Sequence, residues 1–173
     1  GGIHGEKILE GFDGMLQVDG YSGYRRLARP ERHGGQPLVL AHCWSHARRE
    51  VIKATPGKGS PVADELLKQI AHLYAIEKEI RGQPPAQRLK QRQARSRPIV
   101  EKLDTWIADQ RARLSRKSPM GGALAYIANH WDGLRVFLED GRVEMDNNPV
   151  ENLIRPLTLN RKNALFAGHD EGG

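Results

Sequence analysis

Two short apolar runs lie near the amino-terminal end of the chain, and residues with helical spacing follow each of them. Residues 15–19 are Met-Leu-Gln-Val-Asp, and residues 37–41 are Pro-Leu-Val-Leu-Ala. Apolar runs of this length, bounded by glycine, proline and polar residues, are typical of buried strands. Residues 21–27 and 42–49 predict short helices after them. Strand, helix, strand, helix is the order of an α/β sheet, so we predict the α/β class.

A different period begins after a glycine-containing break at residues 55–59. From Ser60 onward apolar residues recur every three or four positions, which predicts a series of amphipathic helices. Pro98 is expected to interrupt or kink one of them, because proline lacks the amide hydrogen that a helix needs. We therefore predict three segments: α/β core elements at 1–59, an all-helical block at 60–140, and a return to the core at 141–173.

The return segment contains a well-marked helix start. Asn148 suits an N-cap position, Pro149 the first helical position and Glu151 the third. One interpretation of Glu151 is structural, because a glutamate at the third position completes a capping box and is favoured by the helix dipole. The other interpretation is chemical and requires a second acid elsewhere in the chain.

Asp19 is the candidate for that second acid, because it stands at the carboxyl end of the first predicted strand. Ligands and catalytic groups collect at this edge of open α/β sheets. An aspartate there also suits a cap for the following helix, so both interpretations stay open. If Asp19 and Glu151 meet in space, the pair predicts a site for Mg²⁺ or Mn²⁺, since Mg²⁺ takes oxygen ligands and commonly only one or two protein carboxylates.

Basic residues outnumber acidic ones, 27 to 21, for a net charge of +6. This balance favours a polyanionic partner such as DNA. Arg155, Arg161 and Lys162 follow the candidate metal acid, and cations in that position would hold phosphates. For the group formed by Arg88, Arg92 and Arg95 we favour a solvated helix face, because charged residues at helical spacing most often face water.

Cys43 and His46 form a Cys-x-x-His pair at the start of the second predicted helix. This is half of a structural zinc set, and the chain has no second cysteine to complete it. We therefore expect Cys43 to pack and His46 to form hydrogen bonds. A single cysteine excludes an internal disulfide and is compatible with a reducing compartment.

No apolar run approaches the roughly 20 residues that span a bilayer, and the sequence shows no signal-peptide pattern. We therefore expect a cytoplasmic protein without a membrane partner. The chain begins at Gly1 rather than methionine and ends in Asp-Glu-Gly-Gly, so we expect it to be part of a longer protein.

Four motifs in register resemble the transposases of the insertion-sequence-66 family. They are LQVDGYSGY at 16–24, CWSHARR at 43–49, DNNPVENLIRP at 146–156 and NRKNALFAG at 160–168. The helical middle is similar as well, at LYAIE (73–77) and RQARSRP (92–98). The resemblance covers nearly the whole chain.

The resemblance implies an Asp-Asp-Glu transposase with a ribonuclease-H-like core that a helical insertion divides. Asp19 would then be the second catalytic aspartate and Glu151 the catalytic glutamate, holding Mg²⁺ or Mn²⁺ for DNA cleavage and strand transfer. Cys43 and His46 would support the site structurally. Transposon ends and target DNA would be the partners, with a second copy or other subunits encoded by the element as possible companions, and the protein would associate with the bacterial nucleoid.

One part of the family pattern is not found in the sequence: the first catalytic aspartate, expected on an earlier strand. We do not assign that role to Asp13, whose context differs. The expectation is a carboxyl-terminal part of a catalytic domain with little activity alone, so whether the chain by itself is an enzyme stays open. Two alternatives are a DNA-binding or interaction remnant without catalysis, and a structural helical protein in which the two acids are unrelated.

Overall fold

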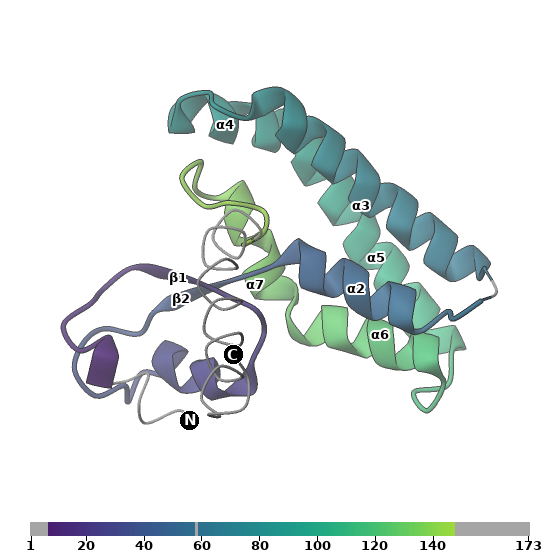
Figure 1. Cartoon of the computed structure of the whole chain (residues 1–173), viewed down its shortest axis with the longest axis horizontal. Helices are drawn as coiled ribbons and strands as arrows, with labels where there is room; N and C mark the ends of the chain where they lie inside the picture. Colours follow the sequence, from purple (N-terminus) through teal and green to yellow (C-terminus); the bar gives the residue numbers. More distant parts are fainter. Residues whose placement is uncertain (1–6, 58, 148–173) are drawn as a thin grey trace, which may run out of the picture.

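The computed structural model describes residues 7–57 and 59–147. Two parts are visible in Figure 1: a small lobe with a two-stranded sheet, and a larger assembly of helices. Helices account for most of the described residues, and the sheet is parallel, so the α/β prediction is correct at this level. A ribonuclease-H-like core is a finer statement and stays a prediction.

The sheet consists of β1 (Met15–Val18) and β2 (Val39–His42), which pair in parallel with Val18 opposite His42. The short 3₁₀ helix η1 (Ser22–Ala28) lies between them in sequence, and its Leu27 is buried. The buried Arg32 ties together the segments that precede the two strands, because its guanidinium donates to three backbone carbonyls: Leu9, Phe12 and Gln36. Because the two strands are parallel and in register, both end at the same edge of the sheet.

Three helices of the helical part begin with proline, directly after Ser60, Pro84 and Ser118. Each proline occupies the first turn, where its missing amide hydrogen costs nothing. The helices are α2 (Trp44–Lys53), α3 (Pro61–Ile80), α4 (Pro85–Gln91), α5 (Arg97–Arg113), α6 (Pro119–Asn129) and α7 (Trp131–Arg135), followed by the 3₁₀ turn η3 (Val136–Leu138).

The predicted disturbance at Pro98 takes the form of a π-helical segment. Residues Arg92–Ser96 (η2) form it between α4 and α5. A π segment shifts the hydrogen-bond pattern by one residue, which accommodates the amide hydrogen that Pro98 lacks. The extra residue also changes which side chains face inward, and it directs Arg92 and Ser96 into the protein, where both are fully buried.

One hydrophobic core joins α2 to the later helices. Trp44, Ala47 and Val51 of α2 pack into the same cluster as Leu66 of α3 and Leu124 of α6. Figure 1 shows α2 running from the end of β2 into the space beside α3, α5 and α6. The packing is thus continuous across residue 59, and the division of the chain at 59 and 140 stays a prediction.

Candidate functional site

Asp19 follows β1 directly and lies exposed at the carboxyl edge of the sheet. Its Oδ1 accepts a hydrogen bond of 3.0 Å from the backbone N–H of Tyr21, which is the local turn that the capping interpretation anticipated. Within residues 7–57 and 59–147, no hydrogen bond or ion pair to the other carboxylate oxygen is formed. Because β1 and β2 are parallel and Val18 pairs with His42, Cys43 is the residue that leaves the same edge from β2.

The segment 144–147 crosses this edge and contacts β1 and the residues that directly follow β2. The Gln17 side chain of β1 donates to the Glu144 carbonyl at 2.9 Å. The Trp44 N–H donates to the Met145 carbonyl at 3.1 Å, and Met145 is buried. The Cys43 thiol contacts the Asn147 side-chain oxygen at 2.7 Å. Residues that the chain separates by more than a hundred positions are thereby joined where the two strands end.

Cys43 and His46 occupy the start of α2. Cys43 is the N-cap residue, and its carbonyl accepts from the His46 N–H at 3.2 Å. The thiol also lies 2.9 Å from the Ser45 hydroxyl, and Cys43 is buried. Among residues 7–57 and 59–147 no three histidine, cysteine or acidic side chains form a group suited to a metal ion. Structural support by Cys43 and His46 stays a prediction.

Replacing Cys43 with alanine should loosen the segment at Asn147. The variant loses the thiol contacts to Asn147 and Ser45, and we expect a destabilisation of about 1–2 kcal/mol, typical of lost buried interactions. Urea unfolding measures the loss, and amide hydrogen exchange measures protection at Asn147, whose N–H lies 3.4 Å from the thiol. Cys43→Ser keeps a donor and is the control. Unchanged Asn147 protection in Cys43→Ala would contradict the assignment.

Arg92 fixes the turn that brings segment 144–147 to the sheet. Its guanidinium makes a bidentate pair with Glu77 of α3, both bonds 2.7 Å long. The remaining nitrogen, Nη1, donates to three carbonyls of η3 and the turn that follows it: Phe137, Asp140 and Val143. Arg92 is therefore a buried structural residue, and our interpretation of it as part of a solvated helix face was wrong. The π segment explains the error, because it changes which residue faces inward.

Arg88 and Arg95 also differ in burial. Arg88 is largely buried and pairs with Glu144 at 2.7 Å, whereas Arg95 is exposed and pairs with Glu79. Only Arg95 of the three therefore matches the predicted solvated face. The pairing with Arg88 also anchors Glu144, the first residue of the segment that crosses the sheet edge.

A pocket of about 310 Å³ lies behind this segment, lined in part by Tyr74, Glu77, Arg88, Glu144 and Asp146. Glu77 and Glu144 are neutralised there by Arg92 and Arg88, so neither is free to serve as a metal ligand. Burial, and then the charge of the Asp146 carboxylate, raise the pKa of the Tyr74 hydroxyl far above its ordinary value. The pocket is therefore charge-balanced and structural in character.

Tyr126 and His130 of the α6 end reach the turn after β1 from the other side. The Tyr126 hydroxyl donates to the Asp19 carbonyl at 3.3 Å, and His130 Nε2 lies 3.3 Å from the Gly20 carbonyl. His42, at the end of β2, stacks edge-to-face on His130 at 4.7 Å, and burial lowers the pKa of His42. Sequence analysis missed these residues, although Tyr126 and His130 stand four apart and thus share one helix face.

Four of the predicted site residues lie outside the described residues: Glu151, Arg155, Arg161 and Lys162. Their meeting with Asp19 stays a prediction. Asp19 itself fits a divalent cation, because it is an exposed carboxylate at a strand end with one oxygen outside the local turn. Mg²⁺ needs only one or two such protein ligands and completes its shell with water or phosphate oxygens.

Comparison with known proteins decides the family. The model described as "Transposase IS66 family" matches residues 1–173. The chain belongs to this family. The sequence resemblance to IS66 transposases is thereby confirmed over the whole chain, and the transposase and insertion-sequence assignments stand with it.

Three relatives of this IS66 chain come from Sinorhizobium fredii. The protein named "Uncharacterized protein y4jD" is 41% identical over 169 residues, which cover 97% of this chain and 33% of the relative. "Uncharacterized protein y4qI" is 40% identical over 95% of this chain and 31% of its own length. "Uncharacterized protein y4hP" is 35% identical over 99% of this chain and 33% of its own length. The chain spans about a third of these relatives.

No solved structure gives a significant match to this IS66 chain. None of the helices in the described part is long and apolar enough to cross a membrane.

Proposed function

We propose that this chain carries part of the metal-dependent phosphodiester-transfer centre of a DNA transposase, with Asp19 as a catalytic carboxylate and metal ligand. One observation carries the proposal. Asp19 lies at the sheet edge where the Cys43 thiol contacts Asn147. Glu151 follows Asn147 by four positions in the sequence. Family membership supports the reaction class, since transposases join and cleave DNA strands.

In this proposal Asp19 and Glu151 hold Mg²⁺ or Mn²⁺. When bound, such ions activate the attacking oxygen and stabilise the leaving oxygen of an in-line displacement. The N–H of Tyr21 orients the Asp19 carboxylate by holding Oδ1, which leaves the second oxygen for the ion. Arg155, Arg161 and Lys162 would bind DNA phosphates, and Cys43 and His46 would support the edge.

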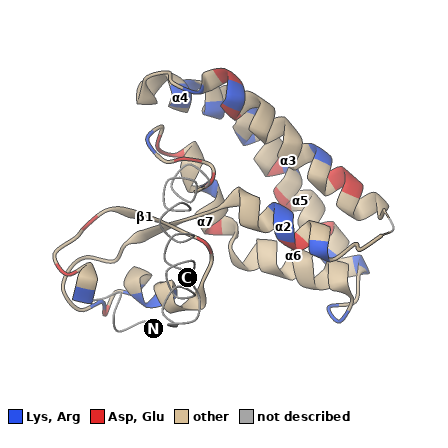
Figure 2. Cartoon of the chain, viewed as in Figure 1, with Lys and Arg blue, Asp and Glu red and all other residues tan. Residues whose placement is uncertain are grey.

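The proposed partners are transposon ends and target DNA, together with a second copy of the chain or other subunits encoded by the element. No membrane partner is proposed. Exposed arginines supply a surface for phosphate contacts: Arg25 on η1 and Arg48 and Arg49 on α2 form no ion pair with another described residue. Figure 2 shows Lys and Arg distributed over η1 and several helices rather than gathered on one element. A cytoplasmic, nucleoid-associated location follows from DNA as partner.

Replacing Asp19 with asparagine should strongly weaken divalent-ion binding. Even residues that only orient metal ligands change affinity 10–100-fold, so removal of a ligand charge should weaken Mn²⁺ binding on the order of 100-fold. Electron paramagnetic resonance of free Mn²⁺ measures the affinity. Asp13→Asn is the matched control, because Asp13 is exposed near the same strand and accepts from the Gln36 N–H. Equal Mn²⁺ affinity in Asp19→Asn and wild-type protein would refute the ligand role.

DNA experiments separate catalysis from simple binding. A relative of full length should nick DNA only with Mg²⁺ or Mn²⁺, and substitution of the residue matching Asp19 should stop the reaction while DNA binding persists. The rival function, a DNA-binding remnant, predicts for this chain salt-sensitive binding that needs no metal and survives Asp19→Ala with Glu151→Ala. Nicking that persists without a divalent ion would overturn the proposed mechanism.

A further inference from the structure

We infer that Tyr126 and His130 are positioning residues that hold the backbone of the Asp19–Gly20 turn and thereby orient the Asp19 carboxylate. The inference rests on the proposed role of Asp19 as a metal ligand. It assigns to the helical part of the chain a direct task at the candidate site: α6 supplies the groups that hold the turn, although it follows Asp19 by a hundred residues in the sequence.

The contacts converge on two consecutive carbonyl groups. The Tyr126 hydroxyl donates to the carbonyl of Asp19, and His130 Nε2 approaches the carbonyl of Gly20, each at 3.3 Å. Gly20 has a φ of +90°, which residues with a side chain rarely adopt. A Cβ atom at this position would lie only 2.6 Å from the Tyr126 hydroxyl and 3.3 Å from His130 Nε2. Glycine thus allows the turn to approach the two side chains.

The two positioning side chains are themselves held in place. Their rings contact each other at 4.2 Å between centroids, and His130 Nδ1 lies 2.7 Å from the Tyr126 carbonyl. The ring of His42 also packs edge-to-face against His130, and its Nδ1 lies 3.2 Å from the His130 carbonyl. His130 is 6% exposed, so the ring has little room to change rotamer. The turn after β1 is therefore held by groups that cannot move independently.

This arrangement matters because, among the described residues, only the Tyr21 N–H restrains the Asp19 carboxylate directly. The carboxylate is exposed, and the N–H of Tyr21, two residues away in the same turn, is the donor that the structure gives it. The backbone of a residue sets the direction of its Cα–Cβ bond, so fixing the Asp19 and Gly20 carbonyls restricts where the carboxylate points. A ligand restrained before the ion binds loses less conformational entropy on binding.

Three substitutions distinguish positioning from simple packing. Tyr126→Phe removes only the hydroxyl that reaches Asp19. His130 donates to the Gly20 carbonyl only when Nε2 carries a proton. His130→Gln places an amide nitrogen near the position of Nε2 and keeps that donor, whereas His130→Asn places one near Nδ1 and keeps only the contact within α6. Tyr24→Phe, which removes a hydroxyl from η1 instead, is the control for the loss of a phenol group.

The measurement is Mn²⁺ affinity by electron paramagnetic resonance, with amide hydrogen exchange at Gly20 and Tyr21 as a local readout. Loss of one hydrogen bond predicts Mn²⁺ affinity about 3- to 10-fold weaker in Tyr126→Phe and in His130→Asn. Near-wild-type affinity is expected in His130→Gln and Tyr24→Phe. If Mn²⁺ affinity is kept in His130→Gln but lost in His130→Asn, the hydrogen bond at Nε2 is responsible, because packing alone does not produce this difference.

The controls keep the two proposals separate. If Asp19→Asn loses Mn²⁺ binding while Tyr126→Phe and His130→Asn bind as tightly as wild type, the positioning role is refuted and the ligand role stands. If Asp19→Asn binds Mn²⁺ normally, the proposed function itself fails. Should His130→Asn not fold, as circular dichroism would show, the conservative Tyr126→Phe variant decides alone.

Discussion

Replacing Arg92 with methionine lowers the free energy of unfolding by about 3–5 kcal/mol, the usual cost of removing one partner from a buried ion pair. The methionine side chain fills similar space but leaves three carbonyls of the 137–143 turn without their donor. Glu77, which is 8% exposed, keeps only the longer 3.5 Å contact with Arg88. Loss of a buried charge partner and of several hydrogen bonds makes this the largest effect expected of a single side chain.

Urea unfolding followed by circular dichroism measures the change. The matched control is Arg95→Met, three residues along the same helical stretch, where the ion pair with Glu79 is exposed and should contribute little. The double variant Glu77→Leu/Arg92→Met should be less destabilised than the sum of its two single variants, because neither charge is then left without a partner. Equal effects of Arg92→Met and Arg95→Met would contradict the assigned role of Arg92.

Gly133→Ala is the second substitution with a large expected effect. Gly133 is a buried residue of α7, and a Cβ atom there would overlap the ring of His42 at the end of β2. The ring also packs against His130 at 4.7 Å between centroids, so moving it aside would disturb that contact. We expect a destabilisation of about 1–3 kcal/mol, as for overpacking of other protein interiors.

Gly122→Ala provides the opposite result on a neighbouring helix. Gly122 is an exposed residue of α6, and a Cβ atom there would meet no other atom within 4 Å. Alanine has the better helix propensity, so this variant should be stabilised by up to about 1 kcal/mol. Thermal unfolding of the two variants should therefore show shifts of opposite sign. A Gly133→Ala protein as stable as wild type would disprove the close contact between α7 and His42.

The local features of the fold were predictable because they depend on residues close together in the sequence. Pro61, Pro85 and Pro119 mark helix starts by their fixed φ, and the short apolar run before Asp19 marks a strand. The position of Asp19 at a strand end follows from the same local pattern. Local sequence was enough to predict these elements.

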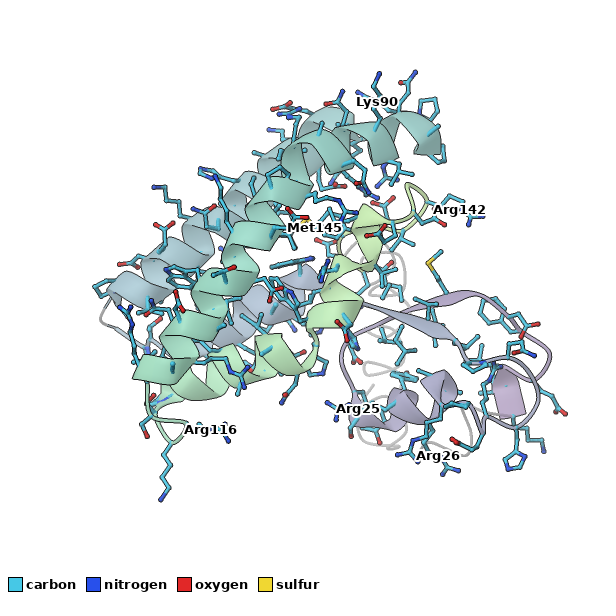
Figure 3. The ribbon with its side chains drawn as sticks, turned by 180° about the vertical axis from the view of Figure 1, so that it is seen from behind. Arg25, Arg26, Lys90, Arg116, Arg142 and Met145 are labelled. Atoms are coloured by element: carbon cyan, nitrogen blue, oxygen red, sulfur yellow. The ribbon has the colours of Figure 1, made fainter. Side chains whose placement is uncertain are left out.

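The features that failed or were missed depend on tertiary structure. The sequence predicted a solvated helix face for Arg92, but the π segment directs its side chain inward. Tyr126 and His130 share a helix face, but nothing in their own sequence neighbourhood indicates that the face meets the turn at Gly20. Lys90 and Arg116 project from the surface in Figure 3, whereas Met145 lies within the molecule. Composition alone does not predict that the isolated Met145 of segment 144–147 is buried.

The contacts at the sheet edge join residues that are very far apart along the chain. Gln17 and Glu144 are separated by 127 positions, Tyr126 and Asp19 by 107, and Cys43 and Asn147 by 104. The hairpin of α3 and the α4–α5 stretch is formed by much closer partners, such as Glu77 and Arg92, which are 15 positions apart. Closing long loops costs chain entropy before their contacts form, which slows such steps in folding. The helical hairpin should therefore assemble early and the edge that carries Asp19 late, so that newly made chains acquire a stable helical body before they acquire the candidate site.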